Sequence, residues 1–277
     1  MKDYYYLLSA VPRLTLEEET YERVDFDQVF SLITENIAVS DGHKLNWLMY
    51  QNDNLNLVSA IARHHRKPVP HHMFHYPSVF DQEVMKDFEK SYVLFPDYMH
   101  DFVEANQDEF AARSIAILEH WLLNAFYKEA TQHEDTFISS YFSFERDLRN
   151  IITALNCQKY DYDKEQQLIG DAYINQQLLR SSAADFGLAQ EYPFVEKLRE
   201  LIEEQRVPNL EHFMDSLLWE YSDELTRFSY FNSHKLLAYT IKLFMVKKWS
   251  WLKPDKGKER LHHLTDRMME HFELPSL

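Results

Sequence analysis

The sequence contains little glycine and few basic residues. It has four glycines in 277 residues, and 29 Lys and Arg against 45 Asp and Glu, which gives a net charge of −16. Nucleotide-binding α/β folds need glycine in tight phosphate turns, so the scarcity argues against such a fold and favours helices. Phosphate contacts need clustered cations, so the charge argues against nucleic acid as a partner.

Cysteine and long apolar runs are also scarce. The single cysteine, Cys157, rules out an internal disulfide and fits a reducing compartment. We interpret it as a buried structural thiol and not as a nucleophile. No apolar run approaches the roughly 20 residues that span a bilayer. The N-terminal apolar segment is interrupted at Pro12 and Arg13 and makes a poor signal peptide, so we expect a cytoplasmic protein.

The apolar residues that are present recur at helical spacing. This periodicity predicts helix pairs around residues 25–65, 108–158 and 210–250 in an all-α chain. The three pairs predict three helical-hairpin units, packed as one compact body, over residues 1–95, 96–190 and 191–277.

Turn and cap residues mark the ends of these helices. Asp25 is a plausible N-cap for the first helix, and Asn232 with Ser233 reads as the turn and cap of the last one. Residues 40–42, with sequence Ser-Asp-Gly, predict the turn inside the first pair.

A nine-residue pattern occurs twice, 94 residues apart. Each copy has an aspartate, an asparagine three positions later and an apolar run that contains alanine. On a helix the Asp, Asn and Ala share one flank of the apolar stripe, where another backbone can approach and bond to the polar side chains. We therefore assign a structural role, with contact to a partner as the alternative. The four polar residues are Asp53, Asn56, Asp147 and Asn150.

No catalytic, cofactor-binding or metal residue is assigned from the sequence. The two aspartates belong to separate units, so nothing places them within reach of one substrate. A His-containing metal-dependent enzyme is nevertheless an alternative, because histidines crowd residues 64–75. The HExxH pattern is absent and prolines interrupt the segment, so we favour a polar loop there, and a solvated helix at His262 and His263. The crowded histidines are His64, His65, His71, His72 and His75.

The second copy and its flanks resemble a known family. Residues 144–151, Phe-Glu-Arg-Asp-Leu-Arg-Asn-Ile, are similar to the C subunit of archaeal and bacterial V-type ATPases, whose eukaryotic counterpart is subunit d. The opening residues 4–14 and the stretch 239–261 look like a divergent branch found with V-type ATPase genes in Bacteroidetes-like bacteria. The last third departs from the pattern, because no Asp-x-x-Asn occurs near residue 241.

The resemblance implies a funnel of three pseudo-symmetric helical units with no enzymatic activity or cofactor. It implies a connector between the membrane proteolipid ring and the central stalk of a rotary motor that drives ion transport, such as proton transport. The protein would be cytoplasmic and peripherally attached to the inner membrane through the ATPase complex, with no direct membrane span. A helical adaptor unrelated to the ATPase is the other alternative.

Overall fold

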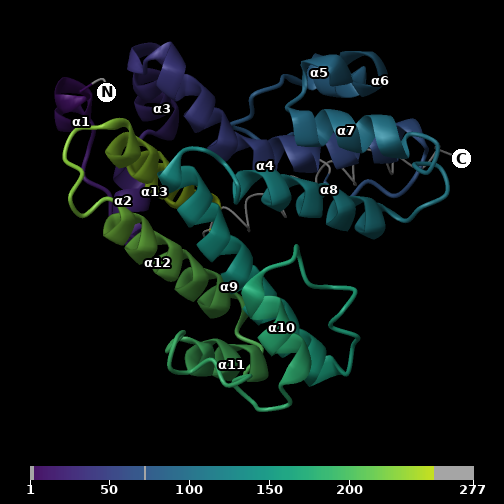
Figure 1. The fold of residues 1–277 in the computed structure, drawn as a ribbon. Helices are drawn as coiled ribbons and strands as arrows, with labels where there is room; N and C mark the ends of the chain where they lie inside the picture. The colour runs from purple at the N-terminus through teal and green to yellow at the C-terminus, as the bar shows by residue number, and fades with distance from the viewer. Residues whose placement is uncertain (1–2, 72, 253–277) are drawn as a thin grey trace, which may run out of the picture. The chain divides into compact units, whose positions relative to one another are not determined.

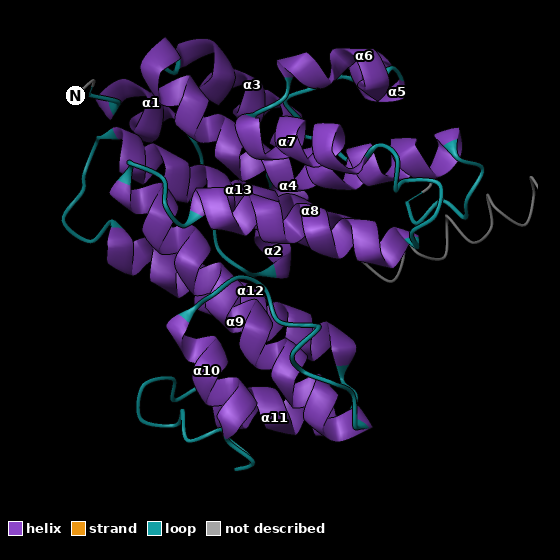
Figure 2. Cartoon of the chain, turned by 45° about the vertical axis from the view of Figure 1, so that its right-hand side comes forward, coloured by secondary structure: helices purple, strands orange, loops and turns teal. Residues whose placement is uncertain are grey.

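The structure is a computed structural model that describes residues 3–71 and 73–252. Within these residues every regular element is a helix: thirteen α-helices and one short 3-10 helix. Figures 1 and 2 show these helices joined by loops, with no strand in the described part. The prediction of an all-α chain is confirmed, and apolar residues at helical spacing are its physical basis.

The chain divides into two compact units. One runs from Ala38 to Phe228, and the other combines the described residues up to Ile37 with those from Ser229 onward. The sequence predicted three units, with boundaries at residues 95 and 190. Hydrogen bonds join the two segments of the smaller unit: the Tyr4 N–H donates to the Phe231 carbonyl over 2.6 Å, and the Tyr239 hydroxyl to the Pro12 carbonyl over 2.9 Å.

The smaller unit is built on one long helix, α13. This helix packs against α2 and α3, and α1 packs against α3. Asp25 accepts the Gln28 N–H at the start of α3, and Asn232 accepts the Lys235 N–H at the start of α13, so both predicted caps are confirmed. The helices are α1 (Tyr5–Ala10), α2 (Glu18–Arg23), α3 (Phe26–Asn36) and α13 (Ser233–Trp251).

The larger unit has four long helices in successive contact. Helix α4 packs on α8, α8 on α9, and α9 on α12. The long helices are α4 (Val39–His64), α8 (Ile115–Ala130), α9 (Thr136–Tyr160) and α12 (Val207–Leu225). The shorter elements are α5 (Gln82–Lys86), α6 (Phe88–Ser91), η1 (Tyr92–Leu94), α7 (Asp97–Asn106), α10 (Tyr173–Arg180) and α11 (Val195–Glu203).

Two helix boundaries differ from the sequence prediction. The break between α3 and α4 lies at Ile37 and Ala38, which have extended backbone, and the predicted turn at residues 40–42 is the start of α4. Helix α8 begins at Ile115 and not near residue 108, because the Ser114 hydroxyl accepts the Ile117 N–H and caps the helix there. Local capping thus decides where α8 begins, which hydrophobic periodicity leaves open.

The core of the larger unit is rich in aromatic residues. Phe126, Tyr127, Phe137 and Phe142 on α8 and α9 are almost completely buried. Cys157 on α9 is also buried, and burial raises the pKa of its thiol, which fits the structural role expected of it. Among the described residues, none of the helices has both the length and the apolar character that crossing a bilayer requires.

Candidate functional site: the repeat asparagines and the groove along α8

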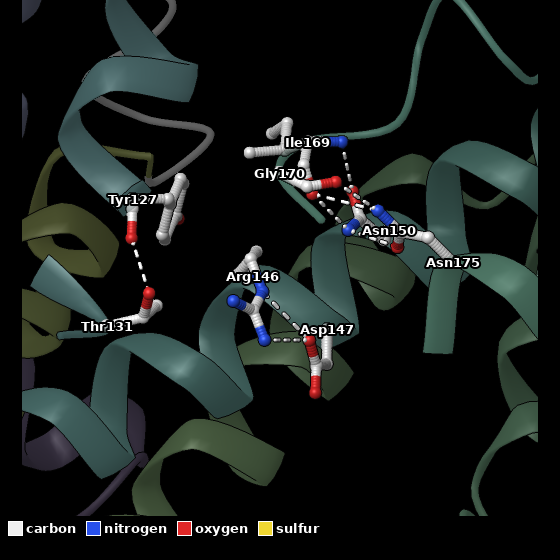
Figure 3. Close-up of polar contacts among 8 residues, drawn as sticks. All are labelled: Tyr127, Thr131, Arg146, Asp147, Asn150, Ile169, Gly170 and Asn175. Atoms are coloured by element: carbon white, nitrogen blue, oxygen red, sulfur yellow. Dashed lines mark hydrogen bonds and ion pairs between the residues drawn. The ribbon is translucent and has the colours of Figure 1, made fainter. Parts of the chain in front are cut away.

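The second copy of the repeat holds a loop against α9. Asn150 is fully buried; its Nδ2 donates to the Ile169 carbonyl over 2.9 Å, and its Oδ1 accepts the Ile169 N–H over 2.8 Å. Asn175 on α10 completes the network, because its Oδ1 accepts a hydrogen bond from Asn150 and its Nδ2 donates to the carbonyls of Ile169 and Gly170 (Figure 3). The loop backbone therefore bonds to side chains where no regular structure supplies partners.

The first copy makes the same pair of bonds with its asparagine. Asn56 Nδ2 donates to the His75 carbonyl over 2.9 Å, and Asn56 Oδ1 accepts the His75 N–H over 2.7 Å. Both asparagines thus bond to the backbone of the residue 19 positions downstream. The two motifs support the loop that follows them in the same way.

The two aspartates, in contrast, have different partners. Asp53 is fully buried and accepts the N–H groups of Val79 and Phe80, over 3.0 and 3.2 Å. Asp147 accepts instead from Nε and Nη2 of Arg146, over 3.0 and 2.8 Å. The two copies therefore differ at their aspartates, because the residue before Asp147 is an arginine that supplies a nearer cation.

Burial sets the electrostatics of both aspartates. It raises the pKa of Asp53 to about 7, although the two backbone N–H donors act in the opposite direction. It also raises the pKa of Asp147, and the Arg146 guanidinium opposes the shift. Both carboxylates are therefore less acidic than an exposed aspartate.

Two equivalent positions of the repeat bond to each other. The Gln51 Nε2 donates to the Glu145 Oε2 over 2.7 Å, and these residues are 94 positions apart, the spacing of the two copies. Burial raises the pKa of Glu145, while Arg149, Tyr127 and Gln51 oppose the shift. The polar contact between the copies therefore includes an ionisable group.

A groove follows the outer side of α8. It is an open hollow of about 1020 Å³ between α8 and the loop that Asn150 holds, residues 165–171. The Arg146 side chain lies between the Tyr127–Thr131 pair and the Ile169–Gly170 turn (Figure 3). The Gly170 N–H donates to Asn124 Oδ1 on α8 over 2.8 Å. Gly170 has a φ of +65°, a backbone conformation that would be strained for a residue with a side chain. The repeat motif thus shapes one wall of this α8 groove.

The lining of the α8 groove carries charge of both signs. Arg113, Lys128 and Arg146 line it, together with Glu165 and Asp171 on the loop. A second hollow of about 460 Å³, between α7 and α8, shares Trp121 and Lys128 with the first. Such an open surface, with charges of both signs and an aromatic residue, suits recognition of a partner's charged side chains.

Sequence reasoning did not identify the α8 groove. Its residues come from positions 113 to 171 and meet only through the packing of α8, α9 and the loop. The one local feature of the sequence that points to the groove is Arg146, which occupies the position equivalent to Asn52 of the first copy. Asn52 donates to the Pro77 carbonyl and so supports its own loop, whereas Arg146 does not bond to the loop backbone.

The histidines of residues 64–75 fall into two groups. His64 and His65, at the end of α4, have ring centroids 4.8 Å apart, and His64 Nε2 lies 3.4 Å from Glu89. His71 and His75, in the irregular segment that follows, also have centroids 4.8 Å apart. His72, His262, His263 and the C-terminal part of the stretch 239–261 lie outside the described residues.

A further histidine, His100 on α7, lies among possible metal ligands. His100, Asp101 and Glu104 bring ligand atoms within 4.8 Å of one another. Both carboxylate side chains are exposed, and exposed acidic groups are common without a bound metal ion.

Comparison with known proteins gives one match. A family model described as "Protein of unknown function (DUF2764)" matches residues 1–272. No match was found among the curated proteins or among the solved structures. Because the model covers nearly the whole sequence, the chain belongs to the DUF2764 family.

Proposed function

We propose that the protein is a non-catalytic connector subunit of a V-type ATPase or ATP synthase, which couples the central stalk to the proteolipid ring for ion transport. The proposal places it in the cytoplasm, attached to the inner membrane through the complex. The resemblance of residues 144–151 to the C subunit motivates it. The observation that carries it is the repeat: Asn56 and Asn150 make the same paired bonds to a residue 19 positions downstream.

The packing of the helix pairs gives further support. Within the larger unit, helix α4 packs on α8 and α9 packs on α12. In both cases the second helix of one predicted pair contacts the first helix of the next pair. The bond between Gln51 and Glu145 agrees with this order, because equivalent residues of two rotated copies meet only near their rotation axis.

Mechanically, a connector must resist deformation. Close-packed helices have low compressibility and transmit strain, and loops held by buried side-chain bonds have fewer alternative conformations. Asn150 and Asn56 restrain two loops in this way. These features suit a body that transmits torque between two partners.

We assign the stalk contact to the α8 groove. Arg113, Lys128 and Arg146 line it in a chain whose net charge is −16. These cations attract acidic side chains of a partner, although Glu165 and Asp171 in the same groove, and the acidic remainder of the chain, repel such side chains. Contacts of this kind fix orientation and make association sensitive to salt.

The test is purification of the ATPase from cells in which this protein carries an affinity tag, followed by deletion of its gene. We expect the ring and stalk subunits to co-purify with the tagged protein, and the deletion to uncouple ATP hydrolysis from ion transport. A tagged protein that folds but captures neither partner would contradict the proposal. So would a deletion strain whose ATPase remains fully coupled.

A further inference from the structure

The smaller unit carries a group of exposed aromatic side chains that the proposed function has not used. Two of them are on α1 and two directly precede the cap of α13; Figure 1 shows α1 beside the loop that leads into α13. The Tyr5 ring centroid lies 4.7 Å from that of Phe231 and 5.6 Å from that of Tyr6. The aromatic surface consists of Tyr5, Tyr6, Tyr230 and Phe231, whose exposed fractions are 51%, 87%, 72% and 37%.

The backbone that carries these rings is held in place. The Tyr4 N–H donates to the Phe231 carbonyl over 2.6 Å, and the Tyr4 side chain is buried. Asn232 accepts the Lys235 N–H at the start of α13, and its Nδ2 donates to the Ser229 Oγ over 3.1 Å. Tyrosine rings on a fixed backbone lose little conformational freedom when a partner binds, because few of their bonds rotate.

No charged side chain belongs to either of the two segments that form the aromatic surface. Residues 4–12 and 229–233 contain no Asp, Glu, Lys, Arg or His, in a chain of which 27% is charged. Depletion of charge together with an excess of tyrosine and phenylalanine is typical of the core of a protein–protein interface. Single exposed apolar residues are ordinary, whereas a contiguous group of them marks a contact site. The aromatic surface therefore has the composition of a docking site.

We propose that the aromatic surface docks on the cytoplasmic loops of the proteolipid ring, an inference that rests on the proposed function. Cytoplasmic loops of membrane proteins carry an excess of Lys and Arg, and such cations bind favourably over the face of a tyrosine ring. The net charge of −16 steers basic loops toward the protein. The contact is separate from the α8 groove, which belongs to the larger unit.

Charge distinguishes the ring from the other surfaces on which an aromatic group docks. Anionic lipids give the cytoplasmic face of a membrane a negative potential, which repels a chain of net charge −16. A second copy of the chain carries the same net charge and is repelled in the same way. Basic loops have the opposite charge, so the ring fits the aromatic surface better than the bare bilayer or a second copy does.

The experiment measures co-flotation of the full-length protein with vesicles that contain the purified ring. Empty vesicles of phosphatidylethanolamine and phosphatidylglycerol are the comparison. We expect the wild type to bind the ring vesicles and not the empty ones. Combined Tyr6→Ser and Tyr230→Ser should weaken binding to the ring at least about tenfold, because both rings lie in the contact. Tyr6→Phe keeps the aromatic face, so it should bind as the wild type does.

Tyr173→Ser is the matched control. Tyr173 is 80% exposed, like Tyr6, but it lies on α10 in the larger unit, so this variant should bind the ring as the wild type does. Every substituted side chain is largely exposed, so the variants should fold, and circular dichroism checks that they do.

The outcomes separate this inference from the proposed function. The aromatic surface is not the contact if the wild type binds the ring and the double variant binds equally well, or if Tyr173→Ser loses as much; the proposed function then stands. Equal binding to empty vesicles assigns the surface to lipid, and a wild-type dimer that the double variant dissociates, measured by light scattering, assigns it to a second copy. Both results overturn the inference, as does a wild type that captures the stalk but not the ring. A wild type that captures neither contradicts the proposed function itself.

Discussion

Replacement of Asn150 by alanine should destabilise the larger unit more than any other single change at the repeat. Asn150 is 0% exposed and Ile169 is 3% exposed, so water cannot replace the lost bonds without local opening. The variant leaves the Ile169 N–H and the Asn175 Oδ1 without their partner. The Ile169 carbonyl keeps a donor, because Asn175 Nδ2 also bonds to it over 3.1 Å.

The expected cost follows from these two lost partners. An unsatisfied buried polar group costs about 1–3 kcal/mol, and alanine in place of asparagine within a helix returns about 0.5 kcal/mol. For two such groups we therefore expect Asn150→Ala to lower the free energy of unfolding by about 1.5–5.5 kcal/mol. Asn56→Ala should cost less, because its partner His75 is only partly buried and water can reach its backbone.

The assay is urea unfolding followed by circular dichroism, with Asn156→Ala as the matched control. Asn156 lies on the same helix, is partly buried, and only donates to the Ile152 carbonyl four residues earlier, so its loss should change the free energy of unfolding by less than about 0.5 kcal/mol. Hydrogen exchange gives a second reading, since the Ile169 N–H should exchange faster in Asn150→Ala. Equal unfolding midpoints for the two variants would refute the reasoning.

Three further predictions concern the charged residues. The pKa of Asp53 is raised to about 7, so this group favours folding at low pH, and its contribution to stability is lost as the pH rises between about 4 and 7. Asp53→Asn should therefore flatten the fall of the free energy of unfolding over that pH range. Parallel pH profiles of the wild type and the variant would contradict this. Asp147→Ala leaves Arg146 without its carboxylate partner at a site that is only partly buried, so we expect the free energy of unfolding in urea to fall by about 1–2 kcal/mol. An unchanged unfolding midpoint would instead favour a role of Asp147 in surface contact. Lys128→Glu reverses an exposed charge in the α8 groove and should weaken co-purification with the stalk subunits without changing stability. Lys90→Glu, which lies outside the groove, is the control. If both variants capture the stalk subunits equally well, the groove is not part of the proposed contact.

The sequence by itself determined the helical class of the chain and the position of its main helices. Few glycines and a 3.6-residue apolar period are local properties, and they give the same answer in any tertiary context. The caps at Asp25 and Asn232 were equally visible, because a cap is made within four residues of sequence. The repeat was visible as well, since it needs only a comparison of the chain with itself.

Only the tertiary structure decided what those residues contact. The sequence could not show that Asn56 and Asn150 bond to residues 19 positions away, or that the aspartates beside them diverge. The α8 groove and the aromatic surface were also hidden, because their residues are far apart in the chain. The physical reason is that periodicity fixes which face of a helix is buried, whereas the element that covers this face depends on long-range packing.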